Sequence, residues 1–167
     1  MDAAAVLQEK FPLKKITPEK YRTMGSLLMR FHLEQYEAEG LGNLCVLKTR
    51  AMLGLMNLLT VVVTPGSGKN VPFLLIDTMD MGKKHLCYVE YYDCTAGDAD
   101  RDLLLIASTP YADQAAAAPV KPENLEGLKA FQQRMIREGN PSTAALTRTL
   151  GKEGAEEFFR TVVMPVP

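Results

Sequence analysis

Asp77 is the residue whose surroundings in this sequence are best suited to proton transfer. It closes the run VPFLLID (residues 71–77), in which no other side chain is charged. A carboxyl group within an apolar strand loses hydration, which raises its pKa toward the range that proton-transfer sites use. A second interpretation stays open, in which Asp77 lies near a strand end and binds backbone amides or a lysine.

Further polar residues are predicted to share a strand face with Asp77. A tight turn at residues 80–83 would place Asp77 opposite Leu86 on the next strand. Alternation along that strand then adds three side chains to the face: Tyr88, Glu90 and Tyr92. Glu90 would lie about 13 Å from Asp77 at the usual strand rise. Thr60, on the preceding strand, would lie opposite Leu75 and therefore diagonal to Asp77.

These residues predict a pocket for a flat, partly polar ligand. Asp77 and Glu90 are its candidate catalytic residues, and the candidate ligand-binding residues are Thr60, Lys48, Arg50, Tyr88 and Tyr92. Lys48 and Arg50 could bind a ligand carboxylate or neutralise acidic side chains, although an exposed sheet edge would also explain them. No metal site is expected, because neither His32 nor His85 has a neighbouring ligand at metal spacing.

The glycine-rich stretch GSGKN (residues 66–70) is not a phosphate-binding loop. Val63 stands where the motif needs its first glycine, and Asn70 replaces the hydroxyl residue that follows the lysine. The segment that follows reads as a strand, so no helix N-terminus is available for phosphate. We interpret residues 66–70 as a hairpin loop.

The elements that must position these residues are four strands in an antiparallel meander, predicted at 43–49, 56–64, 71–79 and 84–93. Because 58–63 and 72–76 are almost wholly apolar, both faces of the sheet are expected to be covered. This predicts a three-layer α/β/α sandwich with a central antiparallel sheet, formed as a single domain over residues 1–167.

Helices are predicted on both sides of these strands in the sequence. The first is short, at residues 3–10; the second starts at Thr17 and Pro18, carries an apolar stripe through Tyr21, Met24, Leu28 and Phe31, and ends near Gly40 or Gly42. Later helices are expected at 99–108, 122–138, 141–150 and 153–163, with a loop at 111–120 and a break at Gly151.

Composition narrows the function classes. The formal net charge is −1 and no basic stripe with interleaved aromatics occurs, which argues against a nucleic-acid partner. No apolar run approaches the roughly 20 residues of a membrane-spanning helix, and the first residues do not resemble a secretion signal. The three cysteines form no CxxC pair, which favours reduced thiols and a cytoplasmic location.

The hairpin TVVVTP (60–65) and VPFLLID (71–77) resembles the core hairpin of ferredoxin-dependent bilin reductases and their red chlorophyll catabolite reductase relatives, over residues 43–93. Pro65, Pro72 and Asp77 match its landmarks, whereas Thr64 replaces a phenylalanine and Thr60 a histidine found in some members. The resemblance implies an α/β/α sandwich in which Asp77 protonates a linear tetrapyrrole. It also implies that no cofactor is bound and that an external donor such as ferredoxin supplies electrons.

Two hypotheses of different classes follow. The first is an oxidoreductase that binds a tetrapyrrole or similar conjugated ligand on the sheet, with Asp77 as proton donor. The alternative is a non-enzymatic ligand-binding or protein-interaction domain of the same fold that could form a homodimer, in which nine methionines serve an adaptable surface. A hydrolase using Asp77 and Glu90 is disfavoured by their separation.

Overall fold

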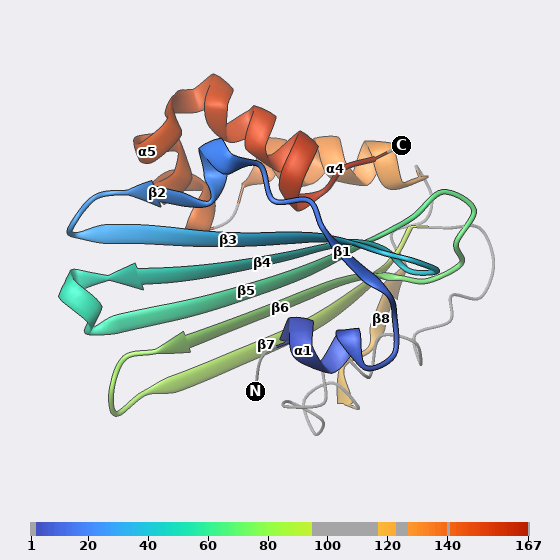
Figure 1. The fold of residues 1–167 in the computed structure, drawn as a ribbon, viewed down its shortest axis with the longest axis horizontal. Coiled ribbons are helices and arrows are strands. Elements are labelled where there is room, and N and C mark those ends of the chain that lie inside the picture. Colours follow the sequence, from blue (N-terminus) through green and yellow to red (C-terminus); the bar gives the residue numbers. More distant parts are fainter. Residues whose placement is uncertain (1–2, 95–116, 123–126, 140, 167) are drawn as a thin grey trace.

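Five long strands form the centre of one sheet, each antiparallel to the next (Figure 1). They are β3 (Met29–Ala38), β4 (Gly42–Ala51), β5 (Met56–Pro65), β6 (Phe73–Asp80) and β7 (His85–Asp93). β8 (Val120–Pro122) pairs in parallel with β7. The computed structural model describes residues 3–94, 117–122, 127–139 and 141–166. None of the helices in these ranges is long and apolar enough to cross a membrane.

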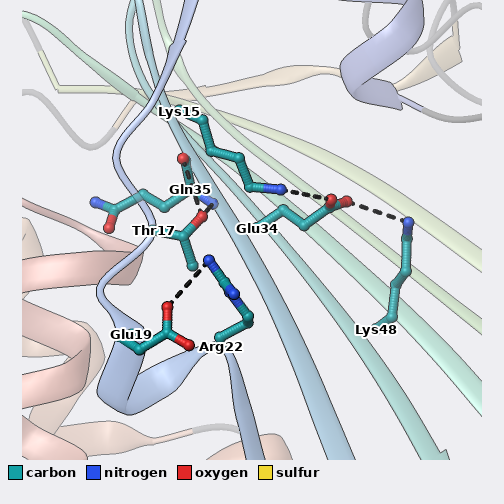
Figure 2. Close-up of polar contacts among 7 residues, drawn as sticks. All are labelled: Lys15, Thr17, Glu19, Arg22, Glu34, Gln35 and Lys48. Carbon is teal, nitrogen blue, oxygen red and sulfur yellow. Dashed lines mark hydrogen bonds and ion pairs between the residues drawn. The ribbon is translucent and has the colours of Figure 1, made fainter.

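The outer edge of β3 is covered by two short strands with an interruption between them. β1 (Leu13–Lys15) pairs with one end of β3 and β2 (Thr23–Gly25) with the other, and the short turn η1 (Glu19–Tyr21) lies between them. Thr17 bridges the interruption, because its hydroxyl accepts a hydrogen bond from the Gln35 amide at 2.9 Å (Figure 2). The amide of Leu33 donates to the Arg22 carbonyl oxygen, and that of Ile16 to the Gln35 carbonyl oxygen.

The helices lie unequally on the two faces of the sheet. On one face, here called the α4–α5 face, α4 (Gly127–Glu138), α5 (Pro141–Phe158) and the π-helical turn η5 (Phe159–Val163) pack against alternate residues of β4, β5 and β6. On the other, the α1 face, only α1 (Ala3–Gln8) packs among the described helices. This six-residue helix covers only the part of that face around Leu44, Val63 and Leu74.

The predicted three-layer α/β/α sandwich is therefore wrong. Over the described residues, the structure is mainly an antiparallel sheet with a helical layer on one face and one short helix on the other. Val61, Val63 and Ile76 are buried in the same cluster as Ala4 and Leu7 of α1, so the prediction of two covered faces holds at one half of each strand. At the other half the α1 face carries polar side chains of Arg50, Asn57 and Thr78.

The long helix predicted to start at Thr17 and to end near Gly40 or Gly42 is also wrong. These residues form the turn η1 and the strands β2 and β3 instead. Burial alternates over residues 31–35 of β3, with Phe31, Leu33 and Gln35 facing inward and the polar side chains of His32 and Glu34 between them. This period of two indicates a strand. The helical stripe through Tyr21, Met24 and Phe31 matched only because buried residues of three separate elements, η1, β2 and β3, happen to fall three to seven positions apart.

Other predicted elements are confirmed. All four predicted strands form, with ends that differ by one or two residues, and residues 66–70 lie in the hairpin connection between β5 and β6. Gly82, at a φ of 74°, lies in the β6–β7 turn, and α1 forms near the start of the chain. Gly151 interrupts α5 as predicted, at a φ of 75° and a ψ of 170°. The predicted helix at 99–108 lies outside the described residues, as does most of the predicted loop at 111–120.

A buried polar clamp holds η5 onto the sheet. The Asn43 amide donates to the Val162 carbonyl oxygen at 3.1 Å and accepts from Gln35 at 2.7 Å. The Thr64 hydroxyl donates to the Val163 carbonyl oxygen at 3.2 Å. From α4, Gln132 donates to the Met164 carbonyl oxygen at 2.5 Å. These side chains satisfy carbonyl groups at the end of the helical segment that water cannot reach.

Candidate functional site

Asp77 and Thr60 lie directly opposite each other on β6 and β5. The Thr60 hydroxyl donates a hydrogen bond of 2.5 Å to Oδ1 of Asp77. Both residues face α4 and α5 and are partly buried beside Leu47, Leu75 and Met135. The two side chains are therefore closer together than predicted, because the sequence placed Thr60 diagonal to Asp77 rather than opposite it.

The strand register differs from the expected one by two residues. Asp77 pairs with Tyr88 rather than Leu86, because the β6–β7 turn occupies residues 81–84, one position later than predicted. Leu75 accordingly pairs with Glu90. A shift of two leaves the parity of a strand unchanged, so Tyr88, Glu90 and Tyr92 do share the face of Asp77 as predicted. Tyr88 is largely exposed there.

Burial raises the pKa of Asp77 above its ordinary value of 3.8. The hydrogen bond from Thr60 opposes this increase, and the nearby charge of Glu90 adds to it. Glu90 itself accepts a hydrogen bond of 2.9 Å from the Tyr92 hydroxyl, and the Tyr92 ring packs against Phe131 of α4. Glu90 and Tyr92 thus have structural partners, and Glu90 acts on Asp77 through its charge.

Replacing Asp77 with asparagine is expected to increase the free energy of unfolding at pH 7. Because the pKa of Asp77 is raised in the folded state, its protonated form fits the fold better than its ionised form. Its contribution to stability is complete below the unfolded-state pKa and is lost as pH rises through the folded-state pKa. The advantage of Asp77→Asn over wild type should therefore shrink on acidification. Urea unfolding of both proteins at pH 7 and pH 4 measures this difference in the free energy of unfolding.

Asp80→Asn is the matched control, because Asp80 lies on the same strand but is exposed and accepts a hydrogen bond from the Gly82 amide. No gain in stability at pH 7 is expected for this variant. If Asp77→Asn were less stable than wild type at pH 7, the desolvated carboxylate would not be the destabilising group that its burial indicates.

The cavity beside Asp77 is too small for the ligand that the sequence suggested. Its volume is about 30 Å³, and it is enclosed by side chains such as Val62, Phe73, Leu146 and Phe159. This is space on the scale of a water molecule, whereas pockets for organic ligands measure roughly 300–1,000 Å³. The expected α/β/α sandwich is not formed, and the described residues leave no space for a tetrapyrrole beside Asp77, so nothing here supports a bilin-reductase-like oxidoreductase that uses Asp77.

Lys48 and Arg50 lie on the opposite face of the sheet from Asp77. Their neighbours on β5 are Leu59 and Asn57, which alternate with the inward-facing Leu58 and Thr60. The structure thus separates the predicted site residues into two groups. Asp77, Thr60, Tyr88, Glu90 and Tyr92 are together on the α4–α5 face, and Lys48 and Arg50 are on the α1 face.

An open groove of about 460 Å³ lies on the half of the α1 face that no described helix covers, here called the uncovered half. Four basic or titratable side chains of β3 and β4 line one side of it: Arg30, His32, Lys48 and Arg50. Arg30 pairs directly with Arg50 across the two strands, and His32 pairs with Lys48. Asn57, Leu59, Thr78 and Asp80 of β5 and β6 complete the groove.

Acidic side chains neutralise part of this groove. Glu34 accepts from Lys48 at 3.2 Å and from Lys15 at 3.1 Å, as Figure 2 shows. Burial raises the pKa of Glu34, but the two lysine hydrogen bonds outweigh burial and keep that pKa below its ordinary value. Asp80 lies 3.5 Å from His85. Neither Arg30 nor Arg50 forms an ion pair with any residue that the structure describes.

Sequence reasoning missed Arg30 and His32 as members of a site. The alternation RFHLE (residues 30–34) in β3 was the available signal, since it places Arg30 and His32 on one face. Read as part of a helix, the same residues have no fixed relation to Lys48 and Arg50.

No protein-family model matches the sequence, and no curated protein matches it either. Function therefore has to be inferred from the residues and their geometry.

Proposed function

We propose that this chain is a non-catalytic binding domain whose ligand is a small carboxylate with an apolar body. The ligand would occupy the groove on the uncovered half of the α1 face. The groove volume of about 460 Å³ falls within the range of pockets for organic ligands. The site around Asp77, with space on the scale of a water molecule, supports no comparable ligand.

The direct pairing of Arg30 with Arg50 carries this proposal. Like charges directly opposite each other in an antiparallel pair destabilise a sheet, because their Cβ atoms are only about 5 Å apart. An anion between the two guanidinium groups would remove that repulsion. A carboxylate suits them, since a guanidinium binds its two oxygens through parallel hydrogen bonds.

The remainder of the groove suits an apolar body with a few polar atoms. The partly buried side chain of Leu59 lies next to Lys48 and Thr78 across the strands, and gives the groove an apolar floor. Asn57 donates to the Gly54 carbonyl oxygen at 3.3 Å, which holds its amide at the rim. We place the domain in the cytoplasm, where its three free thiols would stay reduced.

Replacing Arg30 with glutamine is expected to weaken binding of octanoate at least about tenfold, because the variant loses a charge-assisted hydrogen bond to the carboxylate. Without ligand, the same variant should be more stable than wild type by about 0.5 kcal/mol, because the repulsion with Arg50 is relieved. Calorimetric titration with octanoate and urea unfolding without it measure the two effects.

Arg22→Gln is the matched control, because Arg22 is an exposed arginine paired with Glu19 at 3.0 Å outside the groove. It should leave octanoate binding unchanged. Octanol, which keeps the apolar chain but lacks the carboxylate, should bind much more weakly than octanoate. Equal binding of octanoate by wild type and Arg30→Gln, or no binding by wild type, would exclude this function.

A further inference from the structure

Large apolar side chains are exposed together at one end of the sheet. Leu27 and Leu28 lie in the β2–β3 connection, and Met52, Leu53 and Leu55 lie in or beside the turn η2 (Met52–Gly54) between β4 and β5. Each of the five side chains is at least 60 % exposed. The Met52 amide donates to the Leu28 carbonyl oxygen at 2.9 Å, so the two connections form one surface, here called the apolar tip.

The backbone of the apolar tip is strained where it presents these side chains. Met52 and Leu53 have φ values of 51° and 57°, in the left-handed region that large side chains rarely adopt. Neither side chain is buried, so packing does not account for the strained turn. Glycine or asparagine would fit this turn with less strain. Strained positions that bear exposed apolar groups are typical of functional surfaces.

Basic residues lie at the same end of the sheet as the apolar tip. The connections β2–β3, β4–β5 and β6–β7 all lie at the same end of the sheet, at the left in Figure 1. Across residues 25–30, 50–57 and 80–85, four residues are basic: Arg30, Arg50, Lys83 and Lys84. Asp80 is the one acidic residue in these ranges, and it binds the Gly82 amide and lies beside His85.

We propose that the apolar tip inserts into the interface of an anionic lipid bilayer, with Lys83 and Lys84 against the headgroups. Apolar side chains that protrude from turns need no complementary pocket in a fluid interface, and basic residues near them add attraction to anionic lipids. A second copy of the chain is a poorer occupant. Self-association through this end would bring the same four basic residues of each copy together.

The test uses the full chain and vesicles of phosphatidylglycerol and phosphatidylcholine in equal parts. The protein should sediment with these vesicles, much less with vesicles of phosphatidylcholine alone, and less at high salt. Leu27→Ser combined with Leu53→Asn should weaken vesicle binding at least about tenfold. Lys83→Gln combined with Lys84→Gln should also weaken binding about tenfold or more.

Ile16→Ser is the matched control, since Ile16 is an exposed apolar residue outside the apolar tip and should be replaceable without loss of binding. Asparagine readily adopts the positive φ of Leu53, so the double variant Leu27→Ser with Leu53→Asn should unfold at the same urea concentration as wild type. If it unfolds at a lower concentration, the double variant Leu27→Ser with Leu55→Ser is used in its place. The variants test the tip independently of Arg30 and the groove.

Three results would overturn the proposal. One is a wild-type protein that stays in the supernatant with anionic vesicles. Another is a tip variant that sediments as well as wild type. The third is a dimer, measured by light scattering, that the leucine substitutions dissociate, because the apolar tip would then be the contact between two copies.

Discussion

Replacing Gly42 with alanine is expected to lower the free energy of unfolding by about 3 kcal/mol or more. A Cβ atom at this position would lie 2.3 Å from the Thr64 carbonyl oxygen and 2.4 Å from the Gly66 amide nitrogen. Both are backbone atoms of the neighbouring strand β5 and its loop, so only a shift of the β4–β5 pair relieves the overlap. The positive φ of 138° adds strain of its own. Urea unfolding at pH 7 measures the loss.

Gly40 provides a control two residues away in the same β3–β4 connection. Its φ is 83°, but a Cβ atom there would have nothing within 4 Å. Gly40→Ala should therefore lose only the conformational strain, about 1 kcal/mol. Equal losses in the two variants would show that the overlap with β5 is not what requires glycine at Gly42.

Replacing Asn43 with leucine is expected to lower the free energy of unfolding by about 3 kcal/mol. The leucine has the same number of side-chain heavy atoms but removes the donor to the Val162 carbonyl oxygen and the acceptor for Gln35. Both remaining groups are buried, and a buried polar group without a partner costs about 1–3 kcal/mol. Urea unfolding followed by circular dichroism measures the loss.

Asn57→Ala is the matched control for this prediction. Asn57 also donates to a carbonyl oxygen, that of Gly54, but it is exposed and water can replace the bond. Its loss should be within about 0.5 kcal/mol. A loss below about 1 kcal/mol for Asn43→Leu would mean that the buried polar clamp contributes little to holding η5 on the sheet.

The meander could be predicted because its strands carry their own local signals. Apolar runs with short connections marked β4 to β7, and Gly82 marked the β6–β7 turn. The first strands lacked such clear signals. The residues from Thr17 to Gly40 contain both a helical spacing and an alternation, and pairing with β4 over the whole length of β3 decides between them.

The candidate site was only partly predictable for the same reason. Strand parity brought Asp77 onto one face with Thr60 and Glu90, even though the register was displaced by two residues. Two features depend on tertiary packing: how closely α4 and α5 fill the space beside Asp77, and how little of the other face α1 covers. Local sequence does not encode either of them.

The interrupted edge beside β3 has a consequence for polymerisation. A sheet grows into fibrils when a foreign strand finds a continuous row of unpaired amides and carbonyls. Here the chain itself occupies the positions along β3, with Thr17 filling the interruption between β1 and β2. Each of those outer strands is only three residues long, so an incoming chain finds no extended template on this side.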